Sequence, residues 1–351
     1  MPLSLGPEEA GAYLHTYQAP GPHLDMLSAV GFRAAGAAAR LGVFDALDAG
    51  PMSAPDLAGK LGADERALTM LADLLVSFHY LTRSGDRYAN SPLTERWLRP
   101  GTPGSYLSTL ALWQELLFGL WADVEESIRT GRPAVDFYAW LEGRPEMLRQ
   151  FHDMLAGFAD WNAEDILAAV PVPAGPARLL DLGGGHARHS IAFCQRYPDL
   201  RATVVDLPGA LAVGRDAVAA AGLSDRVSFR EGDLATDPIG GDLDLVLLFN
   251  VLHGNGPGRN EALLRRVAGA LRPGGTVAVL EQLAREERPA AETEAAFVHV
   301  FSLNLLHTQG GRLYDRQAVT GWLTGAGFDP PSWQRLPKMP ADHLAIATMP
   351  R

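Results

Sequence analysis

The chain has 351 residues, of which 47% are hydrophobic and 20% charged, and its formal net charge is −11. This length predicts two or three domains with enough chain to bury a core. The excess of 41 acidic over 30 basic residues disfavours partners that are attracted by positive charge, such as nucleic acids and anionic lipids. Small molecules and a second copy of the chain remain as partners.

The sequence also predicts a compartment. Cys194 is the only cysteine, so a disulfide within the chain is impossible. Residues 1–21 lack the basic and apolar stretches of a secretion signal, and no stretch of about 18 apolar residues predicts a membrane-spanning helix. We therefore expect a cytoplasmic protein.

Helical patterns dominate the N-terminal part. Residues 24–47 are rich in Ala and Leu, which predicts one largely buried helix, with another subunit as a candidate for its covering surface. Ser53 can cap the start of a short helix over 54–61, and Gly62 can end it.

A second helix over 64–80 and a hairpin over 81–89 complete the pattern of a winged-helix domain. A recognition helix would need basic residues to contact phosphate, but this one carries more acidic than basic side chains. The residues concerned are Asp64, Glu65 and Asp73 against Arg66. We therefore predict that residues 1–104 form a helical, winged-helix-like assembly module, with a ligand-sensing DNA-binding regulator as the alternative from another functional class.

Residues 105–170 are predicted to be a helical linker with aromatic-rich segments at 112–121 and 151–161. The apolar side chains of the second segment have two interpretations. They pack in an ordinary core, or as a group they wall an apolar substrate pocket between domains. The substrate-binding candidates among them are Met154, Phe158 and Trp161.

The proline-rich stretch 170–176 marks a domain boundary, and apolar strand patterns alternate with helical ones after it. This alternation predicts that residues 171–351 form a doubly wound, Rossmann-like α/β domain with a parallel sheet covered on both faces. The predicted strands are 177–182, 202–206, 227–229, 243–250, 275–280 and 343–348, and the predicted helices are 187–196, 208–221, 259–270 and 315–326.

A glycine-rich turn follows the first of these strands. In Asp181-Leu-Gly-Gly-Gly185, the glycines leave backbone N–H groups open to a ligand at the start of a helix. A dinucleotide site would have its third glycine where Arg188 stands. The spacing Gly183-x-Gly185-x-Ala187 after Asp181 instead resembles the first motif of S-adenosylmethionine-dependent methyltransferases. A turn that binds no ligand remains the alternative.

Acidic residues follow the next two strands, at the edge where ligands bind in such sheets. Asp206 can accept hydrogen bonds from ribose hydroxyls, and Asp233 can accept one from an adenine amino group while Leu234 packs against the ring. Together with the glycine turn, these residues predict a site for an adenosyl cofactor. Leu207 and Asn250 are further cofactor-binding candidates.

Most of the chain, including the helical module, resembles the small-molecule O-methyltransferases typified by caffeic acid O-methyltransferase and by bacterial polyketide-tailoring enzymes. The resemblance implies S-adenosylmethionine as the cofactor and a homodimer whose N-terminal module contributes to the partner's pocket. The matching motifs are Asp181-Leu-Gly-Gly-Gly185, Val205-Asp-Leu-Pro208, Glu231-Gly-Asp233, Val251-Leu-His253, Leu271-Arg-Pro-Gly-Gly275 and Gly325-Ala-Gly-Phe328.

The resemblance also implies roles for single residues. His253 would be the general base that deprotonates the acceptor hydroxyl, and Glu281 would orient it. A helix over 297–307 would line the acceptor pocket, with Asn304 and His307 as substrate contacts. An imidazole of pKa about 6.5 takes a proton from a phenol of pKa about 10 at a cost of about 5 kcal/mol, which a nearby sulfonium charge can offset. An aliphatic alcohol is a weaker acid, so a phenol or an enol is favoured.

Two departures from the family pattern leave alternatives open. Leu313 replaces the family's second acidic residue, and Gly254-Asn255 replaces Asp-Trp after the histidine. These changes favour, as rivals, methyl transfer to carbon or nitrogen, or a relative that binds the cofactor without methylating. We predict no metal site, although His253, His299 and His307 could hold a metal ion in a keto-acid type of enzyme.

Overall fold

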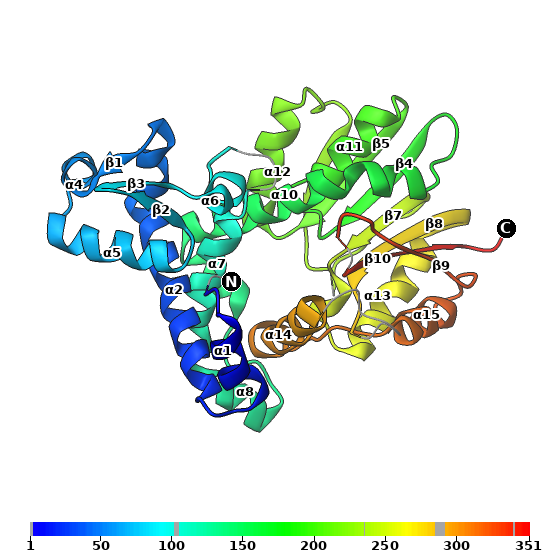
Figure 1. Cartoon of the computed structure of the whole chain (residues 1–351). Helices are drawn as coiled ribbons and strands as arrows, with labels where there is room; N and C mark the ends of the chain where they lie inside the picture. The colour runs from blue at the N-terminus through cyan, green and yellow to red at the C-terminus, as the bar shows by residue number, and fades with distance from the viewer. Residues whose placement is uncertain (1–2, 102–104, 235, 285–291, 340) are drawn as a thin grey trace. The chain divides into compact units, whose positions relative to one another are not determined.

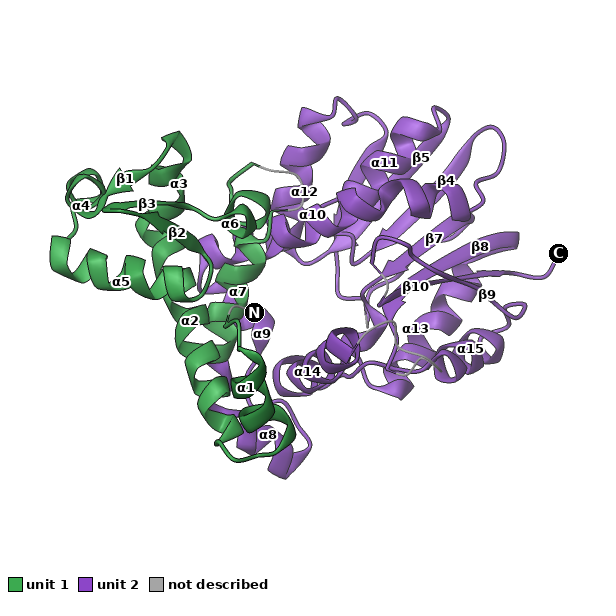
Figure 2. Ribbon diagram, in the orientation of Figure 1, with its two compact units in different colours: residues 1–119 green, residues 120–351 purple. Residues whose placement is uncertain are grey.

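The structure is a computed structural model that describes residues 3–101, 105–234, 236–284, 292–339 and 341–351. It divides the chain into two compact units, Met1–Gly119 and Leu120–Arg351 (Figure 2). Figure 1 labels the helices and strands of both units. The separate linker expected over 105–170 stays a prediction.

Unit 1 is mostly helical, with a small antiparallel sheet of order β1-β3-β2. The hairpin expected over 81–89 is confirmed as β2 and β3, whereas the two-residue strand β1 was not predicted from the sequence. The elements are α1 (Pro7–Ala10), η1 (Gly11–His15), α2 (Gly21–Leu41), α3 (Val43–Ala46), η2 (Leu47–Ala49), β1 (Met52–Ser53), α4 (Ala54–Leu61), α5 (Glu65–Ser77), β2 (Leu81–Ser84), β3 (Arg87–Asn90), α6 (Pro92–Trp97) and α7 (Leu107–Phe118).

The helix ends of unit 1 follow local capping chemistry. The prediction for α4 is confirmed, because the Ser53 hydroxyl accepts a hydrogen bond from the backbone N–H of Asp56 and Gly62 ends the helix in the left-handed region. The single helix expected over 24–47 is wrong. Gly42 has φ +77 and ends α2, so the chain restarts as the separate short helix α3.

Unit 2 contains the large sheet and the helices that cover it. Its elements are η3 (Leu120–Asp123), α8 (Val124–Thr130), α9 (Phe137–Glu142), α10 (Pro145–Ala169), β4 (Ala177–Leu182), α11 (Arg188–Arg196), β5 (Leu200–Asp206), α12 (Pro208–Ala220), β6 (Val227–Glu231), β7 (Leu243–Phe249), η4 (Leu252–Gly254), α13 (Pro257–Ala270), β8 (Leu271–Gln282), α14 (Glu292–Gln309), α15 (Arg316–Gly325), β9 (Ser332–Arg335) and β10 (Asp342–Thr348).

The sheet has seven strands in the order β6-β5-β4-β7-β8-β10-β9. Neighbours from β6 to β8 run parallel, but β10 is antiparallel to both β8 and β9. The expectation of a parallel sheet therefore holds for five strands and is corrected for the last two. The link between β9 and β10 is too short for a helical crossover, so these strands form a hairpin.

Each face of the sheet packs against its own helices. Side chains alternate along β7, so Leu245 and Leu247 join one core with α10, α11 and α12, while Val246 and Leu248 join the other with α13 and α15. Figure 1 shows these helices on opposite sides of the sheet. The carboxyl ends of the five parallel strands meet at one edge, where such sheets bind ligands.

Candidate active site

The turn after β4 needs glycine at its first two positions. Gly183 has φ +78, and a Cβ on it would lie 2.8 Å from Cγ2 of Val251. A Cβ on Gly184 would lie 2.3 Å from the carboxyl carbon of Asp181. The turn therefore presents its backbone at the carboxyl end of β4, as the sequence predicts.

Asp181 lies beneath this turn and is fully buried. Its carboxylate accepts a hydrogen bond of 2.8 Å from the Ser190 hydroxyl on α11. Burial raises the pKa of Asp181 to about 6, partly offset by the Ser190 hydrogen bond. The side chain thus ties the turn to the helix that follows it, and its contact with a cofactor stays a prediction.

Asp206 ends β5 beside the same turn. Its Oδ2 accepts a hydrogen bond of 2.8 Å from the backbone N–H of Gly185, and its Oδ1 accepts one of 2.7 Å from Leu207. Burial raises the pKa of Asp206, while these two backbone hydrogen bonds lower it. A carboxylate can accept about four hydrogen bonds, so it retains capacity for the hydroxyls of a ribose.

The next strands bring further predicted residues to this edge. A Cδ1 of Leu234 lies 3.5 Å from where a Gly183 Cβ would be, so Leu234 lies over the glycine turn. Asp233 is exposed at the end of the same loop. Asn250 follows β7 with φ +57, in the left-handed region, which Asn adopts more readily than most residues other than Gly. A glycine cradle with a carboxylate beside it fits a nucleoside that carries no phosphate.

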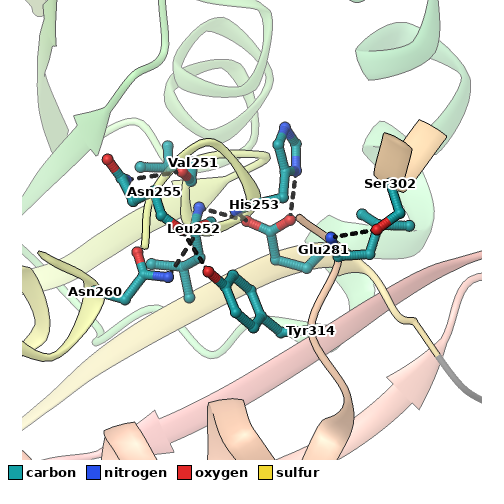
Figure 3. Close-up of polar contacts among 9 residues, drawn as sticks. Val251, Leu252, His253, Asn255, Asn260, Glu281, Ser302 and Tyr314 are labelled. Carbon is teal, nitrogen blue, oxygen red and sulfur yellow. Dashed lines mark hydrogen bonds and ion pairs between the residues drawn. The ribbon is translucent and has the colours of Figure 1, made fainter. Parts of the chain in front are cut away.

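His253 and Glu281 form a buried pair at the ends of β7 and β8. His253 is 8% exposed and Glu281 is 3% exposed. The Nδ1 of His253 lies 2.6 Å from Oε2 of Glu281, and Oε1 accepts a hydrogen bond of 2.6 Å from the backbone N–H of Leu252. Figure 3 shows Glu281 between these two groups. The carboxylate is fixed at both oxygens, so it fixes the imidazole in turn.

The backbone around His253 is held by surrounding side chains. Asn260 on α13 donates a hydrogen bond to the carbonyl of Leu252, and the Tyr314 hydroxyl donates one to the carbonyl of Asn255 (Figure 3). A Cβ on Gly311 would lie 1.9 Å from the carbonyl oxygen of His253. Asn255, which replaces an aromatic residue of the family pattern, donates to the carbonyl of Val251 and so supports the loop.

Residues 121–329 match the O-methyltransferase domain family, and residues 27–100 match the O-methyltransferase dimerisation domain family. The chain belongs to the S-adenosylmethionine-dependent O-methyltransferases. This confirms the predicted family, the fold class of a Rossmann-like sheet with an N-terminal helical dimerisation domain, and S-adenosylmethionine as the cofactor.

Two curated relatives and one solved structure illustrate the similarity. The O-methyltransferase is 32% identical over 300 residues to 3-hydroxy-5-methyl-1-naphthoate 3-O-methyltransferase of Streptomyces sahachiroi. The aligned region covers 83% of this chain and 84% of the relative. The chain is 31% identical over 355 residues to the tetracenomycin polyketide synthesis 8-O-methyl transferase TcmO of Streptomyces glaucescens, covering 96% and 99%. Human N-acetylserotonin methyltransferase in complex with S-adenosylmethionine superposes with a TM-score of 0.81 at 25% identity, covering 99% of this chain and 100% of that one.

Helix α14 of the O-methyltransferase carries two of the predicted acceptor contacts, Asn304 and His307, and each has hydrogen-bond partners within the protein. Asn304 is buried, and its Oδ1 accepts a hydrogen bond of 3.0 Å from the Trp121 indole. His307 is 0% exposed, with one ring nitrogen 2.8 Å from the Ser127 hydroxyl and the other 2.8 Å from the carbonyl of Leu120. Both nitrogens of His307 are therefore engaged within the protein, which argues against its predicted contact with a substrate.

The alternative metal site is not supported. His299 is exposed on α14, whereas His307 is internal, so the eight-residue spacing does not bring them into one environment. Within the described ranges, no group of three or more His, Cys, Asp or Glu side chains is arranged to hold a metal ion. His299 instead lines a cavity of about 640 Å³ together with Ser302 and Arg312, apart from the predicted acceptor contacts.

The apolar candidates on α10 share a face. Met154, Phe158 and Trp161 are spaced one helical turn apart and are all half-buried. A partly exposed apolar face at this position is compatible with a pocket wall. Their contact with an acceptor stays a prediction.

Two histidines near the glycine turn were missed from the sequence. His152 on α10 is buried, its Nδ1 has no hydrogen-bond partner among the residues that the structure describes, and its Cε1 lies 3.2 Å from where a Gly185 Cβ would be. His189 on α11 packs its ring edge-on against Phe249. Burial lowers the pKa of each to about 4, so both are neutral at pH 7. His152 reaches the turn only through the packing of α10, and no sequence motif predicts this placement.

None of the helices within the described ranges is long and apolar enough to cross a membrane.

Proposed function

We propose that this O-methyltransferase methylates a phenolic or enolic hydroxyl group of a small secondary metabolite, with His253 as the general base. The observation that carries the proposal is the buried His253–Glu281 pair at the carboxyl ends of β7 and β8. Glu281 accepts the hydrogen bond of Nδ1–H, so the lone pair of the imidazole is on Nε2. Among the described residues, no hydrogen bond engages Nε2.

His253 and Glu281 would together accept the proton of the acceptor hydroxyl. When bound, S-adenosylmethionine supplies a methyl group attached to a positively charged sulfur. As the acceptor oxygen attacks, its proton passes to Nε2 of His253, and the imidazolium that forms is stabilised by the Glu281 carboxylate. Burial of the pair strengthens this stabilisation, because few water molecules screen the two charges.

The acceptor class follows from acidity and from the relatives. A phenol or enol is acidic enough for a histidine base, whereas an aliphatic alcohol is several pKa units weaker. The name of the Streptomyces sahachiroi relative describes transfer to a hydroxyl on a naphthoate ring. We propose that the acceptor contacts the α10 face and α14, at Met154, Phe158, Trp161 and Asn304.

The cofactor would lie across the glycine turn. We propose that Asp206 binds its ribose and that Leu234 packs against its adenine, with Asp233 at the amino group. The remaining proposed contacts are Asp181, Gly183, Gly185, Leu207 and Asn250. We also propose a homodimer, because residues 27–100 match a dimerisation domain family.

Incubation with cofactor carrying a labelled methyl group, with a panel of phenols, enols, keto acids and amines, tests the proposed reaction. We expect label in the methyl ether of a phenol or an enol. Label attached to carbon or nitrogen would favour the rival transfer reactions. Cofactor binding in calorimetry without transfer to any hydroxyl in the panel would contradict the proposed acceptor class.

A further inference from the structure

Side chains from three elements meet at Gly185, the last glycine of the turn. A Cβ on Gly185 would lie 3.0 Å from Oδ2 of Asp206, 3.1 Å from Cβ of Ala210 on α12 and 3.2 Å from Cε1 of His152 on α10. The Asp206 carboxylate and the His152 ring therefore converge on one point of the turn. Neither the family motifs nor the proposed cofactor contacts include His152.

The packing of α10 fixes the ring of His152. The residue is 5% exposed and packs edge-on against Phe151, with the ring centroids 5.4 Å apart. Phe151 in turn packs edge-on against Phe137 on α9, at 5.3 Å. Because Cε1 is bonded to both ring nitrogens, the edge of the His152 ring that faces the glycine turn is the edge that can form hydrogen bonds.

The two ring nitrogens of His152 differ in their surroundings. In the part of the chain that the structure describes, neither nitrogen makes a hydrogen bond, but only Nδ1 is closed off from solvent. Burial lowers the pKa of His152 to about 4, so the ring is neutral at pH 7 and carries a single N–H. Buried N–H groups without a partner are rarer in proteins than buried acceptors without one. The proton is therefore assigned to Nε2, where the N–H is open to a ligand.

We propose that Nε2–H of His152 donates a hydrogen bond to a ribose hydroxyl of S-adenosylmethionine, and that the same hydroxyl donates to the Asp206 carboxylate. This inference rests on the proposed ribose contact of Asp206. A hydroxyl is both a donor and an acceptor, so it can join an N–H group to a carboxylate. The groups at the amino acid end of the cofactor fit less well, because an ammonium group cannot accept from N–H and a carboxylate is repelled by the charge of Asp206.

Calorimetry with S-adenosylhomocysteine and with its 2′-deoxy and 3′-deoxy analogues tests this contact. His152→Phe keeps an aromatic ring of similar size but removes the N–H, so it should bind S-adenosylhomocysteine about three- to tenfold more weakly than the natural protein. The analogue that lacks the contacted hydroxyl should bind both proteins within about twofold of each other. A loss of the same size with S-adenosylhomocysteine and with both analogues would overturn the proposal.

Two matched variants control for effects on packing. His152→Gln, whose amide nitrogen can reach nearly the position of Nε2, should recover most of the affinity. His189→Gln changes another buried, neutral histidine, which packs against Phe249, and should leave the affinity unchanged within about twofold. An equal loss of affinity in all three variants would indicate a merely structural role of the histidines and would overturn the proposal.

A truncated ligand distinguishes the two ends of the cofactor. 5′-Methylthioadenosine keeps the ribose but lacks the amino acid end, so the loss caused by His152→Phe should persist with it. A loss that disappears with 5′-methylthioadenosine would place His152 at the amino acid end and overturn the ribose contact.

A second measurement uses the natural protein, in which no substitution can disturb folding. Nitrogen NMR of protein labelled at its histidines reads the tautomer of each ring, and the signals of His152 are identified by their loss in His152→Gln. With S-adenosylhomocysteine bound, we expect the proton on Nε2. A proton on Nδ1 alone would leave no donor for the ribose and would overturn the proposal.

The deoxy analogues also separate this inference from the proposed contact of Asp206. If both analogues bind the natural protein as tightly as S-adenosylhomocysteine, the ribose contact of Asp206 is contradicted, and the role of His152 with it. If an analogue binds the natural protein more weakly while His152→Phe loses no affinity, the contact of Asp206 stands and only the role of His152 is overturned.

Discussion

At the scale of single residues, the contact of Glu281 with Nδ1 of His253 determines which ring nitrogen is left to act as the proposed base. In Glu281→Gln, the amide group can donate to Nδ1 and thereby favour the tautomer whose proton is on Nε2, where no proton can be accepted. We expect kcat to fall by about 10²- to 10⁴-fold, with the affinity for S-adenosylhomocysteine unchanged within about threefold. Steady-state kinetics and calorimetry measure the two quantities. A kcat close to that of the natural enzyme would show that the carboxylate does not orient the base.

The buried histidines make a second prediction at this scale, which concerns stability. Burial lowers the pKa of His189 to about 4 in the folded protein, whereas an imidazole in the unfolded chain has its ordinary pKa of about 6.5, so the unfolded chain binds more protons between these pH values. The stability contributed by the neutral ring is present above pH 6.5 and is lost as pH falls through 4, by up to about 3 kcal/mol. Asp181, whose pKa is raised by burial, acts with the opposite sign over the same range.

Urea unfolding of the natural protein and of His189→Gln at pH 7 and pH 4.5 measures this effect. We expect the variant to lose less stability on acidification than the natural protein. Equal losses in both proteins would mean that His189 is protonated in the folded state or that other groups dominate acid unfolding.

At the scale of elements, Ala187 is the strained point of the glycine turn. It is the N-cap of α11, has φ +58 and is fully buried. Ala187→Gly should change the stability by no more than about 1 kcal/mol, because relief of the left-handed conformation is offset by the loss of a buried methyl group and by a more flexible unfolded chain. Ala187→Val should destabilise by more than about 2 kcal/mol, since a β-branched side chain is strongly disfavoured there. Chemical denaturation measures both variants, and an equally stable valine variant would contradict this account of the turn.

Elements with local signals were predictable from the sequence, and those set by distant contacts were not. The cap at Ser53 and the stop at Gly62 fix α4 through neighbouring atoms, so its bounds were predicted correctly. The stop at Gly42 was missed, because the Ala-rich pattern continues past it and only the backbone angle shows the break. The direction of β10 depends on a hairpin with β9, a four-residue strand that the sequence did not reveal.

The candidate site was predictable only in part. The resemblance to the methyltransferase family implied that Glu281 orients His253, and the structure places Oε2 of Glu281 2.6 Å from Nδ1 of His253. The position of His307 did not follow, because helical spacing cannot tell which side of α14 faces the interior. His152 was missed, since its placement depends on the packing of α10.

At the scale of the whole molecule, the dimerisation domain predicts a stable homodimer. Met26 and Val30 lie one turn apart on α2 and are 53% and 49% exposed, which is a large apolar surface to leave in water. We expect twice the mass of one chain in sedimentation equilibrium, and monomers for the double substitution of Met26→Glu with Val30→Glu. Ile128→Glu changes an apolar side chain of unit 2 that is 60% exposed, so it is the control and should stay dimeric. A natural protein that sediments as a monomer would contradict the dimer.

The central claim, that His253 removes the proton of the acceptor hydroxyl, is tested most directly by the dependence of the rate on acceptor acidity. The measurement compares kcat of the natural enzyme, of His253→Gln and of the control His299→Gln for one phenolic acceptor and its analogues with electron-withdrawing groups. We predict that His253→Gln loses about 10²- to 10⁴-fold with a phenol of pKa about 10 and much less with an analogue already ionised at the assay pH, while His299→Gln loses little with either. The same loss with both acceptors in His253→Gln would contradict the claim.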